Sequence, residues 1–352
     1  MHAATLTLVS SLLLGAGLVA QNYVVAPTIL ENLEGNSNNT WPWNNAARYM
    51  QLHGDLKGTP RGFTGIAWRR DGALGNTLAY APRTLTMEVS MGDGNLAAVS
   101  ATFATNYLNT PVNVFTRKTV NAPDWVARRA SEPATFDFAL VFDAPYGYIG
   151  TNDLVYEIVI HATTAGTAGY AADYVNSNAT ANWYGAYQAA GTGCTTANGA
   201  MGLRSQVYAS PSRQLFSLRW DIERGPTSAQ TTCLVGLADP NLPVPGLCTN
   251  LRTDGALFTV SATTNATGTA NSAALTTPYS SSLAGFVFTS QAFALDAGQS
   301  GIPVAGSNGI TITLPAIPAT PPGIARIAAQ GNAAASSGTI YAGTGLVTRL
   351  RY

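Results

Sequence analysis

Short runs of alternating apolar and polar residues, separated by turn-forming residues, are the feature that most constrains the fold of this chain. Such alternation occurs in TLTMEVSMG (84–92), TFDFALVF (135–142), LVYEIVIH (154–161) and QLFSLRWDIE (214–223). A period of two residues is typical of half-buried strands, and Gly, Pro, Asn or Asp between the runs favours antiparallel hairpins. The pattern predicts an all-β protein, in which only NAARYMQLHG (45–54) is a candidate helix.

The length and the spacing of these runs predict two antiparallel β-sandwiches of jelly-roll or immunoglobulin-like type. A chain of 352 residues is long for one sandwich. Small residues before position 190 indicate a boundary, and PAIPATPPG (315–323) is typical of an extended linker. We predict an amino-terminal sandwich over 21–190, an immunoglobulin-like sandwich over 191–315, and a linker with a terminal β-hairpin at a sheet edge over 316–352.

An apolar leader opens the sequence. Its core, LTLVSSLLLGAGLVA (6–20), is uncharged and ends in small residues before Gln21. This length is typical of a secretory signal, whereas a spanning helix needs about 20 apolar residues. We predict a signal peptide over 1–20, cleaved after Ala20, with an uncleaved anchor as the alternative because few charges precede the run. The mature chain is then secreted or held at the cell surface, without a membrane span.

The charge content argues against a nucleic-acid partner. Charged residues make up 10% of the chain, against about 25% in a typical soluble domain, and the formal net charge is zero. Only two lysines occur, Lys57 and Lys118. A phosphate backbone needs a basic surface, which this composition does not offer.

Three cysteines allow one disulfide and one free thiol in an oxidising compartment. Cys233 lies in the apolar run TTCLVGLAD and is expected to pack as a small hydrophobic residue. Cys194 and Cys248 both lie in turn-rich segments, which favours their pairing. A local Cys233–Cys248 loop is the alternative.

Several motifs resemble a pattern found in secreted β-sandwich proteins of environmental Gram-negative bacteria. The amino-terminal module carries EGNSNNTWPWN (34–44), RYMQ (48–51) and GFTGIAWRRDG (62–72). The carboxyl-terminal sandwich carries GTGC (191–194), CLVGLAD (233–239), PGLC (245–248), LAGFVFTSQAFALDAG (283–298) and SNGITITLP (307–315). These proteins have no assigned activity, so the resemblance implies architecture and export only. It also favours the Cys194–Cys248 pairing and leaves Cys233 outside the pattern.

Aromatic side chains are the best functional lead. Trp41 and Trp43 flank Pro42, and in an extended segment both indoles would face the same way. We expect them to anchor the amino terminus in the core of the first sandwich. The alternative is an exposed platform that stacks on sugars, with the surrounding asparagines as hydrogen-bonding groups.

A second aromatic cluster consists of Trp183, Tyr184 and Tyr187, close to the expected domain boundary. With Trp41 and Trp43, these residues are the candidate ligand-binding residues.

Candidate catalytic residues are few. His53 and His161 have no sequence partner that would make a nucleophile–histidine site, and we interpret both as surface histidines. Asp221 and Glu223 in WDIE would share one strand face, as a glycoside hydrolase requires, but Arg219 and Arg224 favour ion pairs instead. We expect no catalytic residue.

No cofactor or metal site is expected either. Calcium remains a possibility at Asp93 in MGDGN or Asp153 in YIGTNDL, although neither loop matches a known calcium motif.

These observations favour a non-catalytic structural or adhesive exoprotein. A carbohydrate-binding protein with exposed Trp and Tyr platforms is the alternative, and a secreted glycoside hydrolase is the third hypothesis. The expected partners are polysaccharides or other surface proteins.

Overall fold

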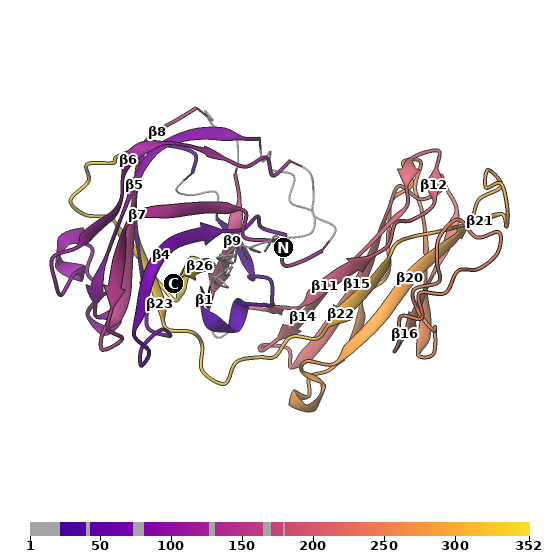
Figure 1. The fold of residues 1–352 in the computed structure, drawn as a ribbon. Helices are drawn as coiled ribbons and strands as arrows, with labels where there is room; N and C mark the ends of the chain where they lie inside the picture. The colour runs from indigo at the N-terminus through magenta and orange to yellow at the C-terminus, as the bar shows by residue number, and fades with distance from the viewer. Residues whose placement is uncertain (1–21, 40–42, 73–80, 127–130, 165–169, 179) are drawn as a thin grey trace, which may run out of the picture.

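The computed structural model describes residues 22–39, 43–72, 81–126, 131–164, 170–178 and 180–352. The predicted signal peptide and Trp41 lie outside these residues. Antiparallel strands build the described chain, which confirms the all-β prediction. Its only helices are four short 3-10 turns: η1 (Thr28–Leu30), η2 (Leu96–Ala98), η3 (Phe103–Asn106) and η4 (Ser281–Leu283). The strands form two lobes, which we call the first and the second lobe (Figure 1).

The first lobe contains a six-stranded sheet in the order β24-β23-β3-β8-β5-β6 and a four-stranded sheet in the order β1-β26-β4-β7. A small sheet, β2-β9-β25, lies beside them. The strands from the first half of the chain are β1 (Tyr23–Ala26), β2 (Ser37–Asn39), β3 (Ala47–His53), β4 (Arg61–Trp68), β5 (Arg83–Gly94), β6 (Val112–Ala122), β7 (Phe138–Tyr148), β8 (Asp153–Thr163) and β9 (Ala172–Asn176). The strands from the carboxyl-terminal end are β23 (Ile324–Gln330), β24 (Thr339–Ala342), β25 (Thr344–Leu346) and β26 (Thr348–Arg351).

The core of the first lobe lies between its two large sheets. The alternating residues of β5 point into it, so the predicted face of Leu85, Met87, Val89 and Met91 is fully buried. Trp68 of β4 and Phe138 of β7 meet this face from the four-stranded sheet. The apolar area removed from water here is the main stabilising contribution, at roughly 25 cal/mol per Å².

The candidate helix over 45–54 is not present: residues 47–53 of this segment form β3. β23 and β8 pair with β3 along its whole length on either side. Tyr49 packs into the core between the sheets, whereas Met50 and Leu52 pack on the outer face. Apolar residues on both faces removed the alternation that would have indicated a strand, and tertiary pairing overrode the local preference.

The carboxyl-terminal segment is more than a linker with an edge hairpin. The chain returns from the second lobe and its last strands lie inside the first lobe (Figure 1). β24 pairs with β23, and β26 inserts between β1 and β4. Leu350 of β26 is fully buried, so this segment is part of the first core.

The second lobe contains two further sheets. One has the order β10-β14-β15-β18, with β19 also on β15, and the other has the order β11-β22-β20-β16-β17, with β21 on β20. β12 and β13 pair separately. The bounds are β10 (Trp183–Tyr184), β11 (Ala186–Ala190), β12 (Thr195–Thr196), β13 (Gly199–Ala200), β14 (Gly202–Ser210), β15 (Leu215–Glu223), β16 (Gln230–Gly236), β17 (Phe258–Thr263), β18 (Ala270–Asn271), β19 (Leu275–Pro278), β20 (Val287–Leu295), β21 (Val304–Gly306) and β22 (Gly309–Thr313). β10 and β11 therefore pair with strands of the second lobe, although the predicted boundary placed them before it.

Side chains from both sheets of the second lobe form one buried cluster. The predicted inward face of β15 is buried, with Phe216, Leu218, Trp220 and Ile222. Trp220 donates its indole N–H to Ser290 Oγ at 3.1 Å, which satisfies the one polar atom that this large side chain brings into the core.

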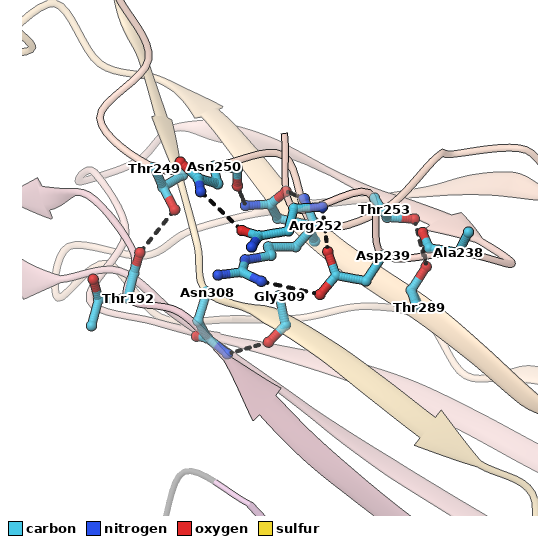
Figure 2. Close-up of polar contacts among 12 residues, drawn as sticks. Thr192, Ala238, Asp239, Thr249, Asn250, Arg252, Thr253, Thr289, Asn308 and Gly309 are labelled. Atoms are coloured by element: carbon cyan, nitrogen blue, oxygen red, sulfur yellow. Dashed lines mark hydrogen bonds and ion pairs between the residues drawn. The ribbon is translucent and has the colours of Figure 1, made fainter. Parts of the chain in front are cut away.

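The Cys194–Cys248 disulfide is present, with 5.3 Å between the Cα atoms, and Cys233 is a buried free thiol on β16. Cys248 belongs to the long irregular segment between β16 and β17. Polar side chains hold this segment in place (Figure 2): Arg252 Nη1 lies 3.2 Å from Asp239 Oδ2 within the segment, and Thr289 of β20 donates to Ala238 O at 3.0 Å. The segment is thus fixed by hydrogen bonds rather than by regular structure.

No helix in the described ranges combines the length and apolar character that crossing a membrane requires.

Candidate functional site

Trp43 is a core residue. It is fully buried, and its ring centroid lies 5.0 Å from that of Trp68 and 5.2 Å from that of Phe138. The anchoring interpretation is therefore correct for Trp43, which offers no surface to a sugar.

The second aromatic cluster divides between the core and a pocket. Trp183 is 3% exposed and packs with Leu30 and Val175 of the first lobe. Tyr187 is equally buried, whereas Tyr184 is half-buried, with its ring 5.6 Å from that of Tyr208. The two tyrosines of this cluster line a pocket, which is described below.

The predicted hydrolytic carboxylates are engaged in ion pairs. Arg219 Nε lies 3.0 Å from Asp221 Oδ1, as the sequence indicated. Glu223 pairs with Arg204, at 3.0 Å, rather than with Arg224. Both carboxylates are therefore held by guanidinium groups on neighbouring positions of the sheet.

The two residues considered for calcium have protein partners. Tyr146 donates its hydroxyl to Asp93 Oδ1 at 2.8 Å. Lys57 Nζ lies 2.7 Å from Asp153 Oδ1, and the Leu96 N–H donates to the other oxygen of Asp153 at 2.6 Å. The Lys57 ammonium and the Leu96 N–H therefore each contact one oxygen of the Asp153 carboxylate.

His53 is not a surface residue, contrary to the prediction. It is fully buried at the end of β3, where its Nε2 lies 2.8 Å from Gln51 Nε2 and its Nδ1 lies 3.6 Å from Asp55 Oδ1. The reason is the pairing of β3 on both sides, which places even its last residue inside the sheet.

His161 lies in a groove on the outer face of the six-stranded sheet, which we call the sheet groove. Its volume is about 650 Å³. The lining side chains come from β3, β8, β5 and β6 and from the segments after η3 and β23: Arg48, Glu88, Ser90, Ala104, Tyr107, Asn109, Pro111, Asn113, Arg117, Glu157, Val159, His161, Ala333 and Ala334.

Strand alternation puts these polar residues on one face. Glu88 of β5 lies opposite Val159 of β8, and Ser90 lies opposite Glu157, so the two glutamates are diagonal neighbours on adjacent strands. Residues two apart on a strand share a face, which brings His161 to the same side. The face opposite these residues is the buried core of the first lobe.

Hydrogen bonds fix the carboxylates of the sheet groove. Arg48 pairs with Glu157 Oε1, and the Tyr107 hydroxyl donates to Oε2 at 3.1 Å. His161 Nε2 lies 3.0 Å from Glu88 Oε1, and Asn113 donates to Glu88 Oε2 at 3.4 Å. Burial, and then the negative charge of Glu157, raise the pKa of Tyr107 well above its usual value, so this hydroxyl keeps its proton and remains a donor.

The sheet groove can recognise a hydroxyl-rich ligand. Its guanidinium, amide, imidazole and carboxylate groups supply both donors and acceptors on one face, and the aliphatic floor comes from Val159. The sequence carried a signal for this site, since polar residues at alternate positions of β5 and β8 define one face. The sequence did not indicate that Arg48 belongs to this site, because Arg48 lies in the segment interpreted as a helix.

A smaller hollow, which we call the junction pocket, lies where the two lobes meet. Its volume is about 290 Å³. The first lobe contributes the buried Glu34 and Glu132, and the second lobe contributes Tyr184, Tyr187 and Gln206. Backbone hydrogen bonds of 2.8 Å in both directions between Glu132 and Tyr187 join the lobes beside it.

Comparisons of the chain with protein-family models, with curated proteins and with solved structures gave no match.

Proposed function

We propose that the chain is an exported, non-catalytic adhesive protein that binds polysaccharide in the sheet groove. The observation that carries this proposal is the set of hydrogen-bonding side chains along the sheet groove, from Arg48 and Glu157 to Glu88 and His161. A sugar chain presents hydroxyl groups that both donate and accept, so a groove of fixed donors and acceptors matches its chemistry.

Pre-organisation supports recognition by this groove. The Glu157 side chain is nearly buried and touches Arg48 and Tyr107, and these contacts hold the groups in place before a ligand arrives. A site that is already ordered loses less conformational entropy on binding.

The surface of the second lobe supports the adhesive part of the proposal. It exposes many large apolar side chains: Leu237, Leu242, Leu257, Phe258, Leu275, Leu283, Phe286, Val287, Leu295 and Ile302. β17 also ends its sheet, with only β16 as a pairing partner among the described strands. Exposed apolar residues and an open strand edge favour contact with other macromolecules.

Export and architecture belong to the same proposal. The disulfide is compatible with an oxidising, extracellular location, and the leader would direct the chain there. We interpret the two lobes, each with its own buried cluster between sheets, as two β-sandwich domains, the first of which is completed by the carboxyl-terminal strands.

Glycoside hydrolysis is a second candidate because Glu88 and Glu157 are diagonal neighbours in one groove. Hydrolysis needs one carboxyl group to donate a proton and the other to attack or to activate water. Both oxygens of Glu157 already accept hydrogen bonds from Arg48 and Tyr107, which favours a binding role.

The test is isothermal titration of the chain, from Gln21 onward, with soluble oligosaccharides of several classes, alongside sedimentation with insoluble polysaccharides. Arg117→Ala and His161→Ala remove groove side chains, and we expect each to weaken binding about tenfold, or roughly 1.4 kcal/mol. Lys118→Ala is the matched control, because Lys118 follows Arg117 on β6 and pairs with Asp143 on β7.

Two results would overturn the proposal. Absence of binding by the unaltered chain, or equal binding by the Arg117→Ala and Lys118→Ala variants, would remove the sheet groove as the sugar site. Release of new reducing ends that stops in Glu88→Gln would instead establish the hydrolase.

A further inference from the structure

We propose that Glu34, Asp71 and Asp173 form a structural site for one hard divalent cation, calcium above all, beside the junction pocket. One carboxylate oxygen from each residue lies within 4.8 Å of the others, and all three residues are buried. Two oxygens on opposite sides of a calcium ion, each at about 2.4 Å, are about 4.8 Å apart. The three oxygens are thus spaced as ligands of a single ion.

The three residues come from separate parts of the chain. Glu34 precedes β2, Asp71 follows β4, and Asp173 lies on β9. Backbone hydrogen bonds align the last two segments: Asp71 N donates to Ala171 O at 3.2 Å and Asp173 N donates to Arg69 O at 3.0 Å. The main chain therefore fixes the relative position of these carboxylates.

Glu34 gives an observation that is independent of the clustering. Its Oε1 accepts from Gly72 N at 2.8 Å, but its Oε2 is buried without a hydrogen-bond partner. The residue is 6% exposed and lines the junction pocket. A buried carboxylate oxygen without a donor is costly, and a bound cation would remove that cost.

Close backbone packing brings the carboxylates together. A Cβ atom on Gly35 would lie 2.1 Å from Asp173 Oδ1, and one on Gly72 would lie 1.9 Å from Glu132 Oε2. Both glycines border Glu34 or Asp71 in the sequence. Only residues without a side chain allow the strands to approach so closely to these acidic groups.

Arg69 pairs with one member of the cluster, Asp173. Its Nε donates to Asp173 Oδ2 at 2.6 Å, and its Nη2 donates to the carbonyls of Leu30 and Leu33. The buried Glu34 Oε2, which has no hydrogen-bond donor, favours an added positive charge at this place.

The ligand chemistry selects the ion. The cluster offers carboxylate oxygens and includes neither sulfur nor imidazole nitrogen, which favours calcium over zinc or copper. Magnesium requires near-octahedral geometry at shorter distances and keeps its water, so we expect it to bind more weakly. Calcium sites of extracellular modules have dissociation constants of about 10⁻⁴–10⁻³ M, which sets the expected range.

The test uses the chain from Gln21 onward after treatment with a chelator. Calcium chloride is titrated calorimetrically, and melting curves are recorded with chelator and with roughly 10 mM calcium or magnesium, well above the expected dissociation constant. We expect one calcium per chain, a higher melting temperature with calcium, and at least a tenfold loss of affinity in Glu34→Gln. Asp143→Asn, which changes an exposed carboxylate of the first lobe, is the matched control and should keep the calcium response.

Either of two outcomes would overturn the site. If the unaltered chain shows neither heat of calcium binding nor a melting temperature that depends on calcium, the three carboxylates do not form a calcium site. A calcium response that persists unchanged in Glu34→Gln would also contradict the proposal, because it would place the ion elsewhere.

Discussion

Arg48 of β3 forms an ion pair with Glu157 of β8, and its guanidinium carbon lies 4.5 Å from the ring centroid of Phe103. The Glu157 side chain is 6% exposed, whereas that of Arg48 is 24% exposed. Arg48 thus connects the edge of the sheet groove to the segment with η2 and η3 that covers Met50 and Leu52. The Arg48–Glu157 pair therefore holds this part of the first lobe together and also lines the sheet groove.

We expect Arg48→Met to destabilise the protein, because it leaves the Glu157 carboxylate nearly buried with only the Tyr107 hydroxyl as a partner. Breaking a buried pair costs about 3–5 kcal/mol, and the partial exposure of Arg48 reduces this to about 1–3 kcal/mol. Urea unfolding measures the difference. Adding Glu157→Gln should recover part of the loss; a double variant no more stable than Arg48→Met would contradict this explanation.

Removal of the disulfide should lower the free energy of unfolding. Cys194 and Cys248 are 54 residues apart, and loop-closure entropy predicts a loss of about 4 kcal/mol in a Cys194→Ala/Cys248→Ala variant. Guanidinium unfolding of both proteins checks the magnitude. An unchanged midpoint would show that hydrogen bonds alone hold the segment around Cys248, such as those of Gln291 on β20 with Arg252 N and Asn250 O.

Cys233 should be inert to thiol reagents in the folded protein. It is 2% exposed, and burial raises the pKa of its thiol well above the usual value, so the reactive thiolate is scarce. A chromogenic disulfide reagent should detect one thiol per chain only after denaturation. Rapid labelling without denaturant would place Cys233 outside the core.

Asp143 should titrate at unusually low pH. Hydrogen bonds from Lys118 and Thr116 lower the pKa of its carboxyl group to about 2. An unfolded aspartate has a pKa near 3.9, so the carboxylate stabilises the folded state above about pH 4, and this contribution is lost as the pH falls toward 2. Carbonyl NMR shifts of Asp143 against pH measure the value.

The control for that titration is Lys118→Met, which should move the pKa of Asp143 back toward its ordinary value. A titration near pH 4 in the unaltered protein would show that Lys118 and Asp143 do not pair in solution.

Trp43→Ala should be strongly destabilising. The indole is fully buried between Trp68 and Phe138, and replacing a buried Trp by Ala costs about 3–5 kcal/mol. The melting temperatures of this variant and of Tyr184→Ala measure the effect. Loss of the half-buried Tyr184 ring should lower the melting temperature less than loss of the Trp43 indole. Equal losses would mean that Trp43 is not part of the first core.

Local sequence patterns determined several strands of this protein, their buried faces and the choice of disulfide pair. Alternation in residues 84–92 and 214–223 predicted two strands and their buried faces, because side chains of a strand alternate whatever its partners are. The turn-rich surroundings of Cys194 and Cys248 indicated the correct pair. Strand alternation and the turn-rich surroundings of a cysteine are both visible in the residues next to it in the sequence.

Tertiary structure decided the rest. β3 is a strand because β23 and β8 pair with it from distant parts of the chain, and that pairing buries His53. β26 lies in the first core, although all strands of the second lobe separate it from β1 and β4 in the sequence. Glu34, Asp71 and Asp173 meet through backbone contacts between separate segments. Such long-range contacts leave no periodic pattern in the sequence, so only the folded chain reveals them.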